Sequence, residues 1–166
     1  MFNSQIIEIM NRFTTLRIIC LSLLLPLLLS CRSDDEEAPP VVEEREYTLS
    51  SVSDPAIYGR ITFTKQDESA TLVKIVLEGT SPGDSHPTHI HANSASEGGP
   101  IVVNLSNVNG ETGISETVVS QLDNGTAIDY EGMLNFNGHA NVHLSPTAMS
   151  TLIAQGDIGS NSEGNN

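Results

Sequence analysis

The chain has 166 residues, with 21 acidic side chains against 7 basic ones and a formal net charge of −14 at pH 7. A surface this acidic argues against nucleic acid and anionic lipid headgroups as partners and favours cations, including divalent metals. Both cysteines, Cys20 and Cys31, lie near the N-terminus, so the rest of the chain has no thiol for a disulfide, a thiolate metal site or a nucleophile.

Residues 1–30 predict an export signal. Arg12 and Arg17 provide positive charge before an apolar run over residues 18–29. That run is shorter than the roughly 20 apolar residues of a membrane-spanning helix, so it belongs to processing rather than to the fold. Met10 is the expected translation start, because it excludes Glu8 from the positively charged region.

The apolar run ends in Leu28-Leu29-Ser30-Cys31, which resembles the lipobox of bacterial lipoproteins. That resemblance implies cleavage before Cys31, lipidation of its sulfur, and anchoring to the Gram-negative outer membrane. Two or more acyl chains anchor a protein stably without spanning the bilayer. The alternative is an ordinary secretory signal that ends near a cysteine.

Residues 31–45 are acidic and contain Pro39 and Pro40, which predicts a solvated tether. An acidic stretch behind a lipidated cysteine also resembles the surface-export signal of some Gram-negative lipoproteins. The domain is therefore expected either to face the periplasm or to be exposed at the cell surface. Residues 160–166 are rich in Gly, Ser and Asn and predict a disordered tail.

Residues 46–159 predict one all-β domain. Alternating segments separated by turn sequences such as Pro82-Gly83 and Asn109-Gly110 indicate an antiparallel immunoglobulin-like or Greek-key β-sandwich or barrel. A capped helical turn is expected near the C-terminus, over residues 145–152, with Pro146 at its first position. The expected strands cover residues 46–51, 59–65, 70–77, 88–92, 101–105, 113–119, 132–136, 139–144 and 154–158.

All five histidines fall in two short segments, His86-Pro-Thr-His89-Ile-His91 and His139-Ala-Asn-Val-His143. Side chains alternate between the two faces of a strand. His89 and His91 therefore share the face opposite Ile90, and His139 and His143 share the face opposite Val142. If Ile90, Val142 and Leu144 enter the core, these imidazoles point away from it. The alternative is a set of exposed histidines without a shared role.

Histidine pairs at this spacing favour a metal site. A His-x-His pair can place two imidazoles on one ion, each at about 2.0–2.1 Å, and His143 is the natural third ligand. Nitrogen donors favour copper or zinc over magnesium or calcium. His89, His91 and His143 are the expected ligands. His86, expected on a loop before Pro87, and His139, two pleats away, are secondary candidates.

Three segments together resemble the chordin-type (CHRD) domain. They are His86-Pro-Thr-His89-Ile-His91, Gly98-Gly99-Pro100-Ile101-Val102-Val103-Asn104-Leu105 and Gly138-His139-Ala140-Asn141-Val142-His143-Leu144-Ser145. The resemblance implies an exported immunoglobulin-like or related β-sandwich associated with extracellular protein binding. The chain departs from the family at His139, where bacterial relatives usually carry an aromatic residue, and in its closing segment, which lacks the Glu-Ile-Arg form.

The pair His89 and His91 with His143 also resembles three copper ligands of copper/zinc superoxide dismutases. Those enzymes need a bridging histidine, further zinc ligands including an aspartate, a disulfide and a channel arginine, and none is identifiable here. The sequence also lacks a Gly-x-Ser-x-Gly elbow and a His-Glu-x-x-His motif. Binding of copper or zinc is therefore favoured over catalysis. A metal-free protein-interaction or adhesion module is the alternative, and a copper oxidoreductase is least favoured.

Overall fold

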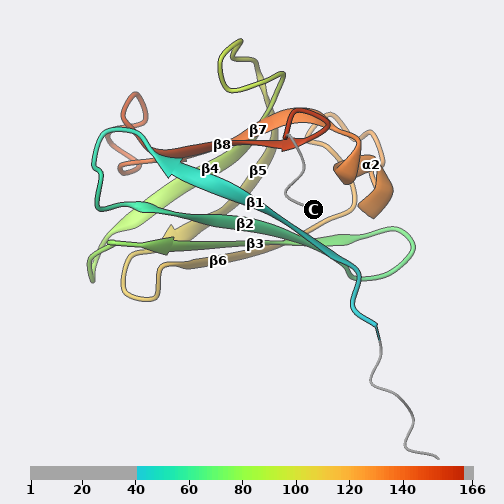
Figure 1. Cartoon of the computed structure of the whole chain (residues 1–166), viewed down its shortest axis with the longest axis horizontal. Helices are drawn as coiled ribbons and strands as arrows, with labels where there is room; N and C mark the ends of the chain where they lie inside the picture. Colours follow the sequence, from blue (N-terminus) through green and yellow to red (C-terminus); the bar gives the residue numbers. More distant parts are fainter. Residues whose placement is uncertain (1–40, 163–166) are drawn as a thin grey trace, which may run out of the picture. The chain divides into compact units, whose positions relative to one another are not determined.

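The computed structural model describes residues 41–162, which form a closed antiparallel barrel (Figure 1). The barrel confirms the expected all-β antiparallel fold. The strands follow one another around it in the order β1-β2-β3-β6-β5-β4-β7-β8. Their bounds are β1 Glu44–Ser51, β2 Tyr58–Lys65, β3 Thr71–Glu78, β4 Ser85–Ala92, β5 Ile101–Asn109, β6 Ile114–Val119, β7 Asn137–His143 and β8 Leu152–Gly159.

Several predictions concern residues outside this range. The signal peptide, the lipidated Cys31, residues 31–40 of the tether and residues 163–166 of the tail lie outside the described residues. Two described segments adjoin them. β1 begins at Glu44, two residues before the expected strand. At the other end, the Asn161 side chain donates to Asn137 Oδ1 at 2.6 Å, so the first residues of the expected tail contact β7.

The barrel core follows from alternation that is clearest on β1, β2 and β3. On β3, Val73, Ile75 and Leu77 are buried, while the residues between them are partly exposed. On β2, Ile61 and Phe63 are fully buried, and the Phe63 ring meets Tyr47 of β1 edge-on at 5.2 Å between centroids. Burying an aliphatic or aromatic side chain of this size contributes about 1.5–3 kcal/mol each. The alternating apolar positions therefore stabilise a single continuous core.

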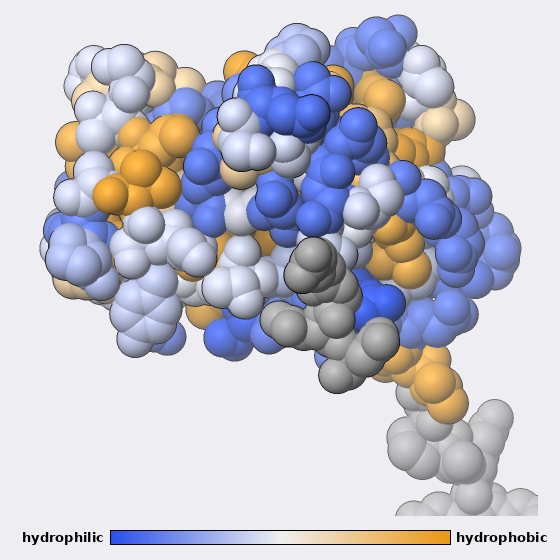
Figure 2. Space-filling model, turned by 45° about the horizontal axis from the view of Figure 1, so that its top comes forward, coloured by the Kyte–Doolittle hydropathy of each residue, from blue (hydrophilic) through white to orange (hydrophobic). Residues whose placement is uncertain are grey.

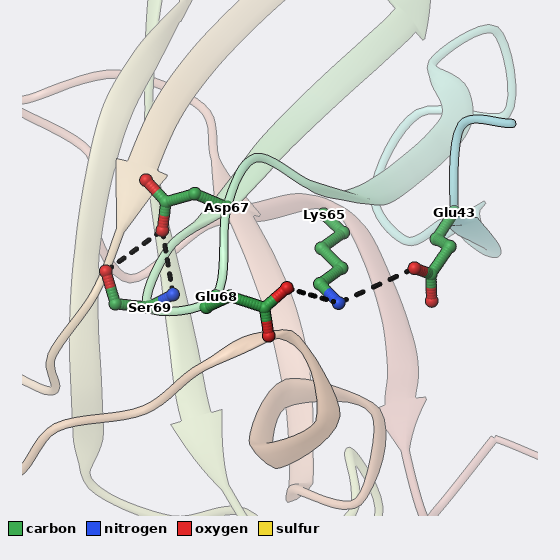
Figure 3. Close-up of polar contacts among 5 residues, drawn as sticks. All are labelled: Glu43, Lys65, Asp67, Glu68 and Ser69. Atoms are coloured by element: carbon green, nitrogen blue, oxygen red, sulfur yellow. Dashed lines mark hydrogen bonds and ion pairs between the residues drawn. The ribbon is translucent and has the colours of Figure 1, made fainter. Parts of the chain in front are cut away.

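Two ion pairs made by Lys65 link the residue before β1 to the β2–β3 turn (Figure 3). Lys65 Nζ lies 3.5 Å from Glu43 Oε1 and 3.2 Å from Glu68 Oε1. In the turn itself, the Asp67 carboxylate accepts hydrogen bonds from the Ser69 backbone at 2.7 Å and the Ser69 hydroxyl at 2.9 Å. Exposed ion pairs are screened by solvent and contribute little to stability, so these contacts order the turn more than they stabilise the fold.

The structure places the short helix elsewhere than the sequence suggested. Residues 145–151 form two turns, closed by hydrogen bonds from Ala148 N to Ser145 O and from Thr151 N to Ala148 O. The helix is α2, Tyr130–Leu134, and it is capped by Asp129, whose side chain accepts from Gly132 N at 2.8 Å. The expected strand over residues 132–136 is therefore wrong. A short apolar run does not distinguish a strand from a helical turn by periodicity alone.

Most of the molecular surface is polar. Figure 2 shows a face that is largely hydrophilic, with apolar residues in small separate patches. Across β3 and β6, for example, Lys74 Nζ contacts Glu116 Oε1 at 2.8 Å on the outside of the barrel. None of the described helices has the length and hydropathy needed to cross a bilayer.

Barrel closure depends on a short contact between β1 and β8. Only Ser50↔Gln155 and Ser51↔Ala154 are paired, and the carbonyl oxygen of Thr48 then crosses directly over Gly156. A Cβ atom at Gly156 would lie 2.0 Å from that oxygen. Glycine is required here because the two backbones approach too closely for any side chain.

We therefore expect Gly156→Ala to lower the free energy of unfolding by about 1–3 kcal/mol, because β1 must move away from β8. Urea unfolding followed by circular dichroism measures this. Ser51→Ala, an exposed change in the same contact, should stay within about 0.5 kcal/mol of the parent. Equal stability of the two variants would contradict the close approach.

Candidate metal centre

The site lies on β4 and β7, which are neighbours in the barrel. Their register pairs His91 with His139 and His89 with Asn141. Ile90 and Val142 are fully buried in the barrel core, so the histidines between and beside them face outward, as the alternation predicts. Leu144 is an exception to the expectation: it follows β7 and is 43% exposed rather than part of the core.

Although they point away from the core, the histidines are not exposed. His89 and His143 are each 8% exposed, and His139 only 1%. On β4 and β7, unlike β3, residues of both faces are buried. The outer face is covered by residues 93–100 and 144–151, which hydrogen-bond to the imidazoles. The exposure assumed by the alternative of exposed histidines without a shared role is therefore wrong.

Three of the imidazoles converge. His89 Nδ1 lies 3.2 Å from His143 Nε2, and one nitrogen from each of His89, His91 and His143 lies within 4.8 Å of the others. Two nitrogens bound to one tetrahedral ion at about 2.0 Å would be about 3.3 Å apart. The cluster could therefore hold a metal ion. Among residues 41–162 it is the only such group of His, Cys, Asp and Glu side chains.

The orientation of His91 is fixed by a backbone carbonyl. Its Nδ1 lies 2.9 Å from the oxygen of Gly99, and a carbonyl only accepts, so Nδ1 carries the proton. Nε2 then presents its lone pair, and it is buried without a hydrogen-bond partner. A buried unpaired acceptor costs about 1–3 kcal/mol, and a bound cation would relieve this. Metal-ligating histidines typically donate their other ring N–H in this manner.

Burial keeps two of the three rings neutral. It lowers the pKa of His89, and the neighbouring His143 and His91 lower it further, while Asp123 acts in the opposite direction. Burial also lowers the pKa of His143; the backbone of Met149 opposes this and His91 adds to it. His143 Nδ1 is buried without a hydrogen-bond partner. Neutral imidazole is the form that binds metals.

An acidic side chain that the sequence did not single out lies close to the cluster. Asn104 of β5 pairs with His89, and its Nδ2 donates to Asp123 Oδ2 at 2.6 Å. This contact places a carboxylate where it favours positive charge at His89. The chain has many acidic residues, and nothing in the sequence around Asp123 sets it apart from the others. Only the pairing of β4 with β5 brings it near the histidines.

The two secondary candidates lie outside the triad and contact loops. His86 is in β4 rather than on a loop, because the strand begins at Ser85, and its Nδ1 donates to the Leu144 carbonyl at 2.8 Å. His139 Nδ1 donates to the Asn93 carbonyl at 2.8 Å. The His139 ring also stacks on His91, with centroids 5.0 Å apart and an interplanar angle of 19°.

No protein-family model matches the chain, and no curated protein is significantly similar to it. The resemblance to chordin-type domains and the looser one to superoxide dismutases therefore rest on the motifs quoted above.

The lowered pKa values predict how the metal-free barrel responds to acid. An unfolded chain takes up protons on His89 and His143 near pH 6.5, whereas the folded barrel resists them, so the free energy of unfolding should fall as pH drops below 6.5. Thermal unfolding between about pH 7.5 and pH 5 measures this. Asp67 and Glu97 also have lowered pKa values, but they titrate below 3.8 and 4.5.

The double substitution His89→Gln, His143→Gln should flatten the dependence of the melting temperature on pH in this window. An unchanged slope in the double variant would show that the two imidazoles are not the groups responsible.

Proposed function

We propose that this protein is a lipid-anchored cell-envelope protein whose barrel binds one copper or zinc ion through His89, His91 and His143. The observation that carries the proposal is the convergence of three largely buried imidazoles, two of them held neutral by burial, around the unpartnered Nε2 of His91. Hydrogen bonding within the protein leaves that nitrogen unsatisfied, whereas a cation would use it.

The donor set indicates the class of metal. Three imidazole nitrogens suit copper or zinc, whereas magnesium and calcium prefer oxygen. The triad has three members among the described residues, fewer than the four protein ligands of a closed structural zinc site. The strongly negative chain attracts cations to its surface in general. Selectivity for transition metals would then come from the nitrogen donors.

Binding is favoured over redox catalysis by the charge around the cluster. Within the described residues, no Lys or Arg follows Lys74, so the segments that build the cluster contribute no cation to guide an anionic substrate. A metal-free interaction module, as the chordin-type resemblance implies, remains the rival function. A measurement of metal affinity separates metal binding from metal-free interaction, since an adhesion surface does not require neutral imidazoles.

Isothermal titration with Cu²⁺ and Zn²⁺ tests the proposal on a soluble form that begins at Val41 and carries no histidine tag. We expect stoichiometric binding at pH 7.4, at micromolar affinity (about 10⁻⁶ M) or tighter, and its loss at about pH 5 as the ligands protonate.

Two matched asparagine variants make this test specific. His91→Asn keeps a side-chain N–H for the Gly99 carbonyl but removes Nε2, and it should weaken binding at least tenfold, about 1.4 kcal/mol. His86→Asn likewise keeps a donor for the Leu144 carbonyl, and it should bind like the parent. If neither metal binds the parent, or if both variants bind equally well, the triad is not a metal site.

The lipobox resemblance supports the proposed anchor and makes a separate prediction. Cys31→Ala removes the sulfur that would carry the lipid, and it should move the protein from the membrane fraction to the soluble fraction. Immunoblots of fractionated cells measure this. Ser30→Ala, which keeps a small residue before the cysteine, is the control and should stay in the membrane fraction. Membrane association of Cys31→Ala would contradict lipid anchoring.

A further inference from the structure

The segment over His91, residues 93–99, starts with a hydrogen bond from Asn93 N to Asn137 O of β7 at 2.9 Å and is then built by its own hydrogen bonds. The Ser94 backbone and hydroxyl donate to Glu97 Oε2 at 3.2 and 2.8 Å, and Gly98 N donates to Ser94 O at 3.0 Å. The segment ends at Gly99, where a Cβ would lie 2.1 Å from the Ala92 carbonyl oxygen. The Gly99 carbonyl, which holds His91, therefore moves with this compact segment.

The first residue of the segment, Asn93, is held by His139, and one side chain from a more distant strand holds its middle. Asp157 of β8 pairs with His139 of β7, which in turn pairs with His91 of β4, so the three residues form a row across the barrel. From the end of this row, Asp157 Oδ1 accepts the backbone N–H of Ala95 at 2.6 Å in a partly buried setting. Hydrogen bonds to a carboxylate are among the stronger ones in proteins.

We propose that Asp157 is a positioning residue for the metal triad. It fixes residues 93–99 through Ala95, and the segment in turn presents the Gly99 carbonyl to His91 Nδ1. That contact keeps the proton on Nδ1 and the lone pair of Nε2 directed at His89 and His143. Asp157 does not touch the metal. Its effect on affinity rests on the proposed function, but its effect on the tautomer of His91 does not.

The test compares Asp157→Ala with Asp157→Asn, whose side-chain oxygen can still accept from Ala95. In Asp157→Ala we expect the affinity for Zn²⁺ to fall roughly 10- to 100-fold, as for other residues that orient ligands. In the metal-free full chain, nitrogen-15 NMR should show His91 shifting from the Nδ1–H tautomer to a mixture. Asp157→Asn should restore most of both properties. Glu111→Ala removes the same charge from an exposed turn and should change neither.

An unchanged tautomer and unchanged Zn²⁺ affinity in Asp157→Ala would overturn the inference, as would a loss that Asp157→Asn does not restore. If Asp157→Ala fails to fold, Asp157→Ser, which is too short to reach Ala95, replaces it. If the parent binds no metal, the proposed function fails, yet the tautomer of His91 still decides whether Asp157 positions the ring.

Discussion

The site depends on one constraint: the outer face of β4 and β7 is covered, although strands of a barrel normally leave that face to water. Two segments, residues 93–100 and 144–151, remove water from the imidazoles that point outward there. Each segment is tied to the strands by an imidazole N–H that donates to a backbone carbonyl, at Leu144, Gly99 and Asn93. Burial lowers the pKa of His89 and His143, which keeps them neutral, and the carbonyls fix which nitrogen of His86, His91 and His139 carries the proton.

The same arrangement separates the histidines by role. His86 and His139 use Nδ1 to hold covering segments and stay outside the triad. His91 does both, because its Nδ1 holds Gly99 while its Nε2 is buried without a partner and its ring belongs to the triad. The acidic chain attracts cations at long range, and the neutral imidazole nitrogens select among those cations at short range. The first concentrates cations, and the second discriminates against those that prefer oxygen.

Much of this could be predicted from the sequence. The strict alternation of Val73, Ile75 and Leu77, and the opposition of Ile90 to His89 and His91, follow directly from the geometry of a strand. The barrel closure could not be predicted, because it depends on the approach of Thr48 to Gly156 across the whole chain. The sequence also does not predict the covering of the histidines, the proximity of Asp123 or the contact of Asp157 with Ala95. These are long-range contacts made by loops, which carry no periodic pattern. The helix at Tyr130–Leu134 was missed since its short apolar run fits a strand equally well.

The most direct test of the central claim is anomalous diffraction at the zinc absorption edge, from crystals of the barrel grown with Zn²⁺. We expect one peak among His89 Nδ1, His91 Nε2 and His143 Nε2, at about 2.0–2.1 Å from each nitrogen. A map with no peak there, or with zinc bound only to surface carboxylates, would contradict the claim.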